Sequence, residues 1–316
     1  MSTRPEMPLP APLVSVVLPT HNRPEWLAEA LTSVLDGDFD DLEVIVSDNG
    51  DPGPTRRLRA RLTDPRVRWV EQDRGLAMLD NMLAGYALAR GRYVAVLHDD
   101  DRWSPRLLAT LVAPLERHPH AVLAFADHYV MDASGRLDPD ATDECTRAWG
   151  RVELAEGLHQ PFLELAVARQ SVSITSCVFR RASLPVAELT PEVGAYYDVW
   201  VAYLLAATGG AAYFSPERLS YTRERTAKDV GPGRSIDAVY CERRLLGDPR
   251  LAPHRDVLVR RLATHHAWAG SGLLRQGARG PARAHLRAAL RLRPTAKALA
   301  WLVASVVVPG GVLARL

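Results

Sequence analysis

The sequence predicts an α/β protein with a Rossmann-like, mostly parallel sheet flanked by helices, and with a helical extension at its C-terminal end. Two observations predict this class. Apolar runs typical of strands buried on both faces alternate with helical segments between residues 13 and 126. From residue 235 onward, every patterned segment has helical spacing instead. Because consecutive parallel strands need right-handed crossovers, the alternation implies one sheet covered by its connecting helices.

The strands and helices of the first part follow in a regular order. Pro24 supports the start of the first helix, because the first helical turn does not need the missing N–H. Gly91 ends the third helix. We predict strands at 13–18, 42–47, 67–71, 93–97 and 122–126, and helices at 25–35, 56–62, 78–90 and 105–117.

The pattern after residue 126 is weaker. A turn signal at 132–135 predicts that 129–137 returns as an antiparallel strand. Further expectations are an irregular stretch at 139–158, helices at 162–169 and 196–208, strands at 174–179 and 211–214, a charged loop at 215–234, and helices at 236–246, 256–276, 281–292 and 295–308. The chain is therefore divided into a flexible proline-rich tail (1–12), an α/β domain (13–230) and a helical region (231–316).

Composition and charge exclude several protein classes. Of the 316 residues, 47% are hydrophobic and 24% are charged, a globular balance that excludes wholesale disorder. From Gly270 on there are eight Arg or Lys and no acid, which suits an anionic surface better than a nucleic acid. Three widely spaced cysteines predict neither a disulfide framework nor a zinc site, and the N-terminus lacks an apolar signal segment. We therefore expect a cytoplasmic protein.

Three adjacent acids follow the strand at 93–97. Asp99, Asp100 and Asp101 repel one another unless solvent, a cation or a hydrogen-bond donor meets them. In parallel α/β sheets the ligand crevice lies beyond the carboxyl ends of the strands, which is where these acids are expected. Their hard oxygens suit Mg²⁺ or Mn²⁺. The alternative is a solvated acidic turn that caps the helix starting near Pro105.

Several motifs, taken in order, resemble the inverting family 2 glycosyltransferases of the GT-A fold. The motifs are VSVVLPTHNRPEWLAEALTSVL at 14–35, VIVSDNG at 44–50, the helix that contains Asn81, GRYVAVLHDDDRWSP at 91–105 and YYDVW at 196–200. Each motif alone is weak, but the ordered set with compatible spacing is more specific. The resemblance covers residues 13–225 and implies a GT-A-type sheet, a nucleoside diphosphate sugar donor and Mg²⁺ or Mn²⁺.

The resemblance also implies which residues bind the donor. Residues after the first strand correspond to those that hold the base and ribose, and the acid that ends the second strand reads a pyrimidine edge, which favours UDP or dTDP. Asp80 stands where arginine is usual, so Arg74 is a candidate to replace it. The implied nucleotide-sugar-binding residues are Thr20, His21, Asn22, Arg23, Asp48, Asn49, Arg74, Asn81, Asp99, Arg223 and Arg225.

Three acids carry the chemistry that the resemblance implies. Asp100 matches the metal-binding acid and Asp99 the acid beside it, while His98 replaces the usual first acid of that motif. Asp198 matches the general base that takes the proton from the acceptor hydroxyl. Structural roles remain open for single residues: His21 could be an ordinary loop histidine, Asp48 a turn residue, and Asp198 an acid favoured at a helix start.

The predicted function is a metal-dependent inverting glycosyltransferase. It moves a sugar from its donor to a hydroxyl of a glycan, a lipid-linked sugar or a small-molecule aglycone by a single displacement. One alternative is a sugar-1-phosphate nucleotidyltransferase, which would want a basic, glycine-rich loop after the first strand. A second alternative is a non-catalytic nucleotide-sugar-binding protein.

The C-terminal segment allows two interpretations. Residues 298–314 carry no charge, yet Pro309 breaks the run after about twelve residues, which is too short to span a bilayer. The preceding helix places Arg283, Arg287 and Arg291 on one face. A basic face followed by an apolar helix predicts peripheral attachment to the inner face of an anionic membrane. The other interpretation is a lid on the catalytic domain or a contact in a homo-oligomer.

Overall fold

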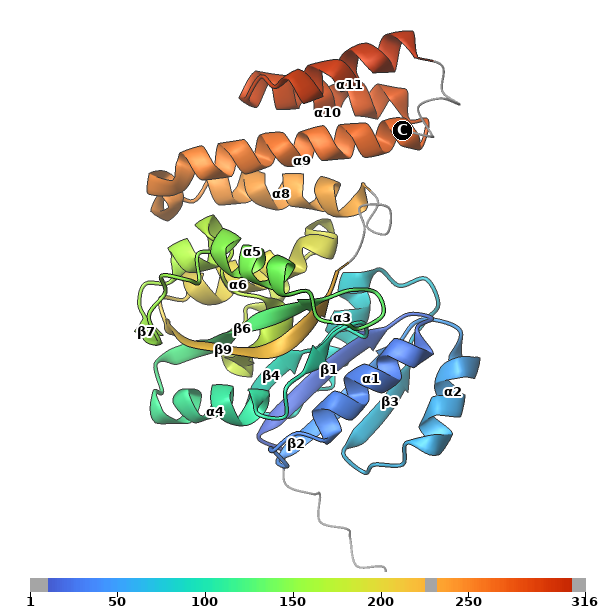
Figure 1. Cartoon of the computed structure of the whole chain (residues 1–316), viewed down its shortest axis with the longest axis vertical. Coiled ribbons are helices and arrows are strands. Elements are labelled where there is room, and N and C mark those ends of the chain that lie inside the picture. The colour runs from blue at the N-terminus through green and yellow to red at the C-terminus, as the bar shows by residue number, and fades with distance from the viewer. Residues whose placement is uncertain (1–10, 225–231, 309–316) are drawn as a thin grey trace, which may run out of the picture.

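A mixed β-sheet forms the centre of the molecule (Figure 1). The computed structural model describes residues 11–224 and 232–308. Within these residues the sheet has nine strands in the order β3-β2-β1-β4-β8-β6-β9-β5, and β7 pairs with β9. The strands are β1 (Val14–Thr20), β2 (Leu42–Asp48), β3 (Val67–Glu71), β4 (Tyr93–Val96), β5 (Arg102–Trp103), β6 (Ala121–Met131), β7 (Gly157–His159), β8 (Cys177–Arg180) and β9 (Ala211–Arg223).

The first four strands form the predicted parallel half of the sheet. Strands β3, β2, β1 and β4 lie side by side and run parallel. The helices that connect them are α1 (Pro24–Leu35), α2 (Pro52–Arg61) and α3 (Met78–Ala87). The register pairs Thr20 with Asp48 and Val17 with Val96. The carboxyl ends of β1, β2 and β4 therefore meet at one edge of the sheet, as a ligand crevice requires.

The apolar residues of the buried strands are divided between two cores. In β1, Val14, Val16 and Leu18 belong to the core that includes α1 and α4 (Leu107–Arg117). Val17 belongs to the core on the other face, which includes α3 and α6 (Tyr197–Ala207). Neighbouring side chains of a strand point to opposite faces, so a strand covered by helices on both sides is apolar throughout. This explains the uninterrupted apolar runs in the sequence.

The second half of the sheet differs from the prediction in three places. The segment expected to be irregular contains α5 (Pro139–Ala148), whose first turn is capped by the Asp138 carboxylate. In the segment expected to return as a strand at 129–137, residues 129–131 are the end of β6, and an isolated bridge joins Met131 to Leu137 across the turn. Residues 215–223 of the segment expected to be a charged loop are strand, because β9 continues beyond its first four residues in parallel with β6.

The predicted C-terminal helices form successive layers above the sheet (Figure 1). The first of them packs on the α/β part: the Asp237 carboxylate accepts a hydrogen bond from Ala195 N–H (2.8 Å), and Glu242 accepts one from the Tyr196 hydroxyl (2.7 Å). Within the described residues, no helix combines the length and apolarity that a membrane span requires. The helices are α8 (Gly233–Leu246), α9 (Arg255–Arg275), α10 (Arg279–Leu292) and α11 (Ala296–Val307).

Candidate active site

A cleft of about 630 Å³ lies at the carboxyl ends of β1 and β4. It is lined by the residues that follow these strands, by the start of α6, by parts of the chain between α5 and β8, and by α8. The lining residues are Pro19, Thr20, His21, Arg23, Asn49, Leu76, Met78, Asn81, His98, Asp99, Asp100, Asp101, Trp149, Gln170, Val172, Ser173, Ile174, Thr175, Ala195, Tyr197, Asp198, Val199, Thr222, Arg223 and Arg234. Most of the residues predicted for the site therefore meet in one cavity.

Asp99 joins the end of β1 to the acidic turn. Its carboxylate accepts hydrogen bonds from Thr20 Oγ1 (2.8 Å) and from the backbone N–H of His21 (3.3 Å). It also pairs with Arg23 Nη1 (3.1 Å). Burial raises the pKa of Asp99, and the charge of Arg23 opposes that rise. Asp99 therefore orients the residues after β1, and both of its oxygens already have protein partners.

His98, Asp100 and Asp101 form a compact group of side chains that could hold a metal ion. One donor atom from each residue lies within 4.8 Å of the other two. Both aspartates are buried, and His98 Nε2 hydrogen-bonds the hydroxyl of Tyr197. Two carboxylates with an imidazole fit a divalent cation. The group contains Asp100 as predicted, together with His98 and Asp101, and it does not include Asp99.

Arg223 lines the cleft and is bound to the acidic turn, and its predicted role in donor binding stays a prediction. Its Nε donates to the carbonyl of Asp100 (2.9 Å), and its Nη2 pairs with Glu29 (2.9 Å). Its Nη1 donates to a backbone carbonyl, and its backbone N–H donates to Asp101 Oδ1 (2.9 Å). Each guanidinium nitrogen thus has a protein acceptor. We conclude that Arg223 holds the acidic turn in position.

Two buried asparagines hold the ends of β1 and β2 together. Asn81 Nδ2 donates to the carbonyls of Ser47 (3.0 Å) and Thr20 (3.3 Å), and its Oδ1 accepts from Ser47 Oγ (2.8 Å). Asn49 Nδ2 donates to a loop carbonyl, and its Oδ1 lies 3.1 Å from His21 Nδ1. These contacts fix the His21 ring at the edge of the cleft. They also attach α3 to the sheet where the donor was expected.

Asp48 has a buried carboxylate oxygen with no partner among the described residues. Its Oδ1 accepts a hydrogen bond from Gly50 N–H (2.9 Å). This is the turn contact that the sequence allowed as an alternative role for Asp48. Its Oδ2 is buried and makes no hydrogen bond there. An unsatisfied buried acceptor costs about 1–3 kcal/mol, and more when it is charged. Asp48 does not line the cleft, but a hydrogen-bond donor that reached this oxygen would remove that cost.

Asn22, Asp48 and Arg74 are predicted donor-binding residues that do not line the cleft. Asn22 adopts a left-handed backbone (φ 56°), and its Oδ1 accepts from Asp51 N–H (2.6 Å). Arg74 lies 3.6 Å from Asp51, with 72% of its side chain exposed. Arg225 lies outside the described residues. Asn22 and Arg74 stabilise the loops after β1 and β2, and a role for them in donor binding stays a prediction.

Asp198 stands at the start of α6, and its charged partner comes from α8. Asp198 Oδ2 accepts from Arg234 Nη2 (2.8 Å), and its Oδ1 accepts from Val199 N–H (2.8 Å). The Arg234 guanidinium lies 5.3 Å from the ring centroid of Tyr196. Burial alone would lower the pKa of Arg234, but the ion pair with Asp198 raises it above its usual value. Arg234 therefore remains a cation and fixes the position of the carboxylate.

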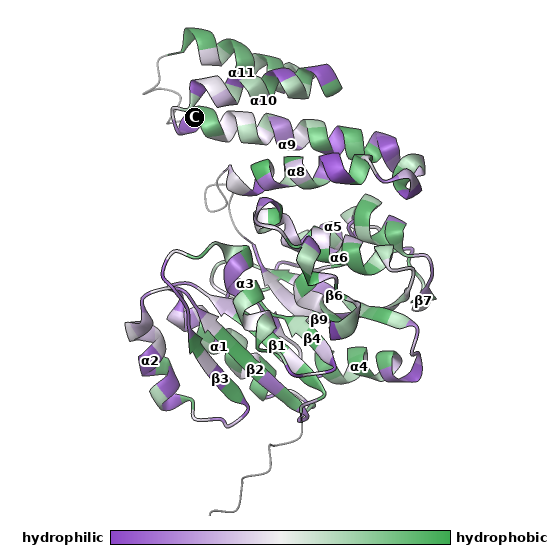
Figure 2. Cartoon of the chain, turned by 180° about the vertical axis from the view of Figure 1, so that it is seen from behind, coloured by the Kyte–Doolittle hydropathy of each residue, from purple (hydrophilic) through white to green (hydrophobic). Residues whose placement is uncertain are grey.

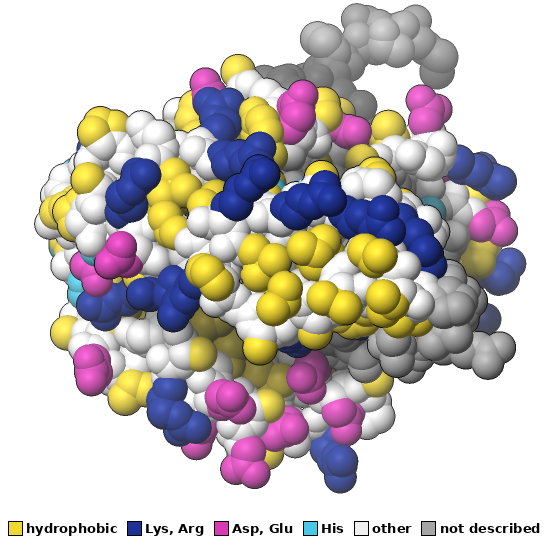
Figure 3. Space-filling view, turned by 90° about the horizontal axis from the view of Figure 1, so that it is seen from above, with side chains coloured by type: hydrophobic (Ala, Val, Ile, Leu, Met, Phe, Trp, Pro, Cys, Tyr) yellow, Lys and Arg dark blue, Asp and Glu magenta, His cyan; other side chains and the backbone are white. Residues whose placement is uncertain are grey.

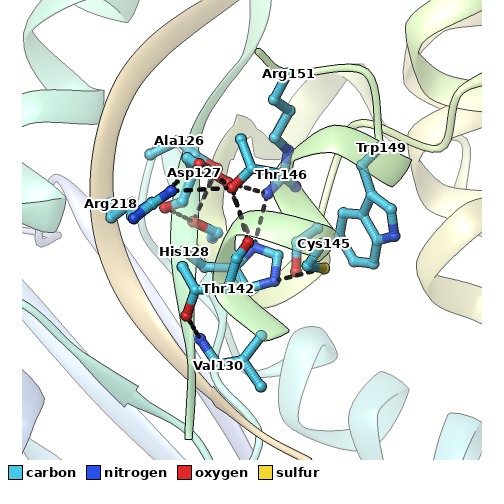
Figure 4. Close-up of polar contacts among 12 residues, drawn as sticks. Ala126, Asp127, His128, Val130, Thr142, Cys145, Thr146, Trp149, Arg151 and Arg218 are labelled. Atoms are coloured by element: carbon cyan, nitrogen blue, oxygen red, sulfur yellow. Dashed lines mark hydrogen bonds and ion pairs between the residues drawn. The ribbon is translucent and has the colours of Figure 1, made fainter. Parts of the chain in front are cut away.

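A buried polar cluster supports another part of the cleft wall (Figure 4). Trp149 lines the cleft, and the guanidinium carbon of Arg151 lies 4.7 Å from its ring centroid. The Arg151 side chain is buried, and its Nη1 donates to Asp127 Oδ1 (2.7 Å) and to His128 Nδ1 (2.6 Å). Arg218 pairs with the other oxygen of Asp127 (3.4 Å). The ion pairs thus hold the indole as a rigid surface of the cleft.

A fall in pH is expected to destabilise this cluster. Burial, together with the charge of Arg151, lowers the pKa of His128 to about 3. The unfolded chain binds a proton near pH 6.5, so stability that is fully present above that pH is lost as the pH falls toward 3. The loss from this group should reach on the order of 3 kcal/mol by pH 4. Urea unfolding between pH 7 and pH 4 measures it.

A pair of variants isolates the contribution of this histidine. His128→Gln keeps an acceptor for Arg151 and should flatten the pH dependence, whereas His120→Gln, at an exposed position, should leave it unchanged. If both variants keep the wild-type slope, carboxylates and not His128 account for the loss of stability in acid.

The comparisons with known proteins identify the family of the chain. Residues 15–170 match the family model described as Glycosyl transferase family 2. The chain belongs to glycosyltransferase family 2. A curated relative is the putative colanic acid biosynthesis glycosyl transferase WcaA of Escherichia coli, which is 28% identical over 121 residues, or 38% of this chain and 43% of WcaA. The chain spans less than half the length of the first curated relatives that it matches.

Solved structures extend the likeness of this family 2 chain to nearly its whole length. The structure of S. aureus TarS 1–349 in complex with UDP-GlcNAc covers 96% of the chain, and 90% of that 1–349 chain is covered, with a TM-score of 0.61 and 14% identity. The mannosyltransferase PcManGT from Pyrobaculum calidifontis, in complex with GDP-Man and Mn²⁺, covers 96% of the chain (86% of its own) with a TM-score of 0.60 and 20% identity. At these identities the likeness shows the fold, and it confirms the predicted GT-A fold.

The structure adds residues to which the sequence assigned no role in the site. Asp101 and His98 were noted beside Asp100, but the motif did not indicate that both belong to the group that could hold a metal ion. Trp149 lies in a stretch that was expected to be irregular. No sequence pattern indicated that Arg234 belongs to the site. It lies in the helical region and reaches Asp198 only because α8 packs on the α/β part.

Proposed function

We propose that this family 2 member is a metal-dependent, inverting glycosyltransferase with a nucleoside diphosphate sugar as donor, UDP or dTDP being favoured. The observation that carries the proposal is that Asp100 and Asp198 line one cleft. A single displacement needs a cation at the leaving diphosphate and a base at the acceptor hydroxyl. The acidic turn after β4 and the start of α6 offer these two functions from two elements.

We assign the nucleotide of the donor to the ends of β1 and β2. Thr20 and His21 are held there by Asp99, and the unpaired Oδ2 of Asp48 offers an acceptor. The N3–H of uracil or thymine is a suitable donor, which supports the preference for UDP or dTDP. The TarS structure contains UDP-GlcNAc and the PcManGT structure contains GDP-Man, so the shared fold does not by itself select the base.

We assign the divalent ion, Mg²⁺ or Mn²⁺, to Asp100 together with His98 and Asp101, while Asp99 remains a further candidate from the sequence. When bound, such an ion supplies positive charge that offsets the charge developing on the leaving diphosphate. Arg23 contacts both Asp99 and Asp100, so it adds a second positive charge beside the same group. The presence of Mn²⁺ in the PcManGT structure supports this assignment.

We assign the general base to Asp198. Its carboxylate takes the proton of the acceptor hydroxyl, whose oxygen forms a bond to the anomeric carbon as the bond from that carbon to the diphosphate oxygen breaks. The sugar is transferred with inversion, and the nucleoside diphosphate leaves. Arg234 is a positioning residue in this scheme, because it fixes one oxygen of Asp198.

We place the acceptor against Trp149. This residue and Gln170 line the same cleft as Asp198, and the buried network behind the indole keeps it rigid. An aromatic face with a fixed orientation is an apolar platform for the face of a sugar ring. This favours a glycan or another sugar-bearing acceptor over a small aglycone. The name of WcaA, which refers to colanic acid biosynthesis, supports a role in polysaccharide or glycoconjugate biosynthesis.

A donor screen tests the proposal. Thermal unfolding of the full chain is measured with UDP-, dTDP- and GDP-sugars, each with Mn²⁺, with Mg²⁺ and with EDTA. A ligand at 100 times its Kd stabilises the folded state by about 2.7 kcal/mol, so a true donor should raise Tm by several degrees and should do so only with the metal. A shift that is equal with EDTA would contradict the metal dependence.

Matched variants and a product assay separate the alternatives. Asp48→Asn should abolish the preference for uridine or thymidine donors, whereas Asp51→Asn, at the exposed neighbouring loop, should not. A nucleotidyltransferase would release pyrophosphate from a nucleoside triphosphate and a sugar 1-phosphate. A non-catalytic binding protein would bind the donor without hydrolysing or transferring the sugar.

A further inference from the structure

Helix α11 is apolar on two opposite sides. On the inner side, Ala298 and Ser305 are buried, and Trp301 and Leu302 pack on a small core made by α9 and α10. On the outer side, Leu299, Val303, Val306 and Val307 are 52–68% exposed. Their spacing of three and four residues places them on one face of the helix. Figure 2 shows α11 as largely hydrophobic.

The outer face of α11 is held rigidly. Arg283 donates to the Ser305 carbonyl (2.7 Å) and Oγ (3.1 Å), and Arg279 donates to the Val308 carbonyl, so α10 satisfies backbone groups at the end of α11. The guanidinium of Arg275 lies 5.0 Å from the ring centroid of Trp301. These contacts fix the inner side of the helix. The four exposed aliphatic side chains are therefore presented as a fixed surface.

Basic side chains border this surface, and acids are absent from the sequence around it. No Asp or Glu follows Asp256 in the sequence. Arg287 and Arg291 on α10 are exposed, as are Arg293 and Lys297 between and within the two helices. Figure 3, which looks down on this end of the molecule, shows a cluster of apolar side chains with a row of Lys and Arg beside it. The end of the molecule is thus both apolar and positively charged.

We propose that the outer face of α11 inserts into the interface of an anionic lipid bilayer. The aliphatic side chains of Leu299, Val303, Val306 and Val307 would lie among the acyl chains just below the headgroups, with the helix parallel to the membrane plane. The neighbouring arginines would contact the lipid phosphates. This inference does not depend on the proposed function, because it uses none of the residues of the cleft.

A membrane fits this surface better than a second copy of the chain. A twelve-residue helix is about 18 Å long and ~10 Å wide, so its face covers roughly 200 Å². A stable dimer needs about 800 Å² on each partner. Pairing two such ends would also bring rows of arginine together with no acid between them, whereas an anionic lipid surface supplies the missing charge.

Vesicle flotation tests the proposal. The full chain is floated with vesicles of phosphatidylcholine alone and with vesicles that contain phosphatidylglycerol, at low and at high salt. We expect binding to the anionic vesicles at least about tenfold stronger than to the neutral ones, and a loss of most of that preference at high salt because the lipid and arginine charges are screened. Equal binding to both lipids, or binding to neither, would overturn the proposal.

Matched variants identify the surface that binds. Val306→Asp should abolish flotation, whereas Val152→Asp should not, although both valines are 64% exposed. The double variant Arg287→Glu, Arg291→Glu should lose the preference for anionic vesicles. All three variants should keep the wild-type Tm and the wild-type rate with water-soluble substrates. If light scattering shows a dimer that Val306→Asp dissociates, the occupant of this face is a second copy and the membrane proposal is wrong.

Discussion

Replacing Asp198 by asparagine is expected to lower kcat by at least about 10²-fold, with little change in donor affinity. General-base assistance is typically worth 10²- to 10⁴-fold, and an amide cannot take the proton of the acceptor hydroxyl. Asn has nearly the same shape, so its oxygen can still accept the hydrogen bond from Arg234. The measurement is steady-state transfer with the donor found by the screen, together with donor Kd by calorimetry.

A control variant at a second acidic residue distinguishes a catalytic role of Asp198 from stabilisation of a helix start. Asp256 occupies the first turn of α9 and is exposed, so Asp256→Asn removes the same favourable interaction with a helix dipole far from the cleft. That control should keep wild-type turnover. Parallel losses of donor binding and kcat in Asp198→Asn would instead indicate a structural role at the start of α6.

Replacing Asp100 by asparagine is expected to lower turnover by about 10²-fold or more and to remove the metal-dependent part of donor affinity. Offsetting the charge of the leaving diphosphate is worth several kcal/mol, and each 1.4 kcal/mol corresponds to a factor of ten. Removing one of three adjacent carboxylates also relieves repulsion, so Tm should not fall. Binding of Mn²⁺ to the protein with donor present, followed by electron paramagnetic resonance, provides a readout independent of activity.

Variants of the two neighbouring acids decide which of them completes the metal site. Asp101→Asn should weaken Mn²⁺ binding as Asp100→Asn does, because Asp101 shares the compact group with His98. Asp99→Asn should weaken donor binding while the remaining affinity stays metal-dependent, because Asp99 holds Thr20 and Arg23. The reverse pattern would restore Asp99 as the metal ligand suggested by the sequence.

The parallel half of the sheet and its acidic edge could be predicted because their signals are local. A strand buried on both faces has to be apolar at consecutive positions, and the ends of such strands are marked by polar residues. Asp48, Asp99 and Asp100 could therefore be assigned to one edge of the sheet from the pattern of neighbouring residues alone. The helices of the C-terminal region were equally clear, since each has a strong helical period.

The lengths of β6 and β9 could not be predicted in the same way. The C-terminal halves of these strands contain Asp127, His128 and Arg218. Charged or polar residues such as these are not typical of a buried strand. These side chains become compatible with burial only because Arg151, more than twenty residues away, pairs with Asp127. The fold determines this pairing, and no pattern among neighbouring residues of the sequence indicates it.

The fold family, the buried strands, the helices and the presence of acids at the sheet edge all follow from the amino-acid sequence, because hydrophobic periodicity and adjacent carboxylates are properties of neighbouring residues. The distribution of roles among these acids depends on the folded chain: Asp99 holds Thr20, whereas Asp100 and Asp101 lie with His98. Folding also brings Arg234 from the helical region to Asp198. Both results depend on contacts between distant segments, and such contacts form only when the two cores pack around the sheet.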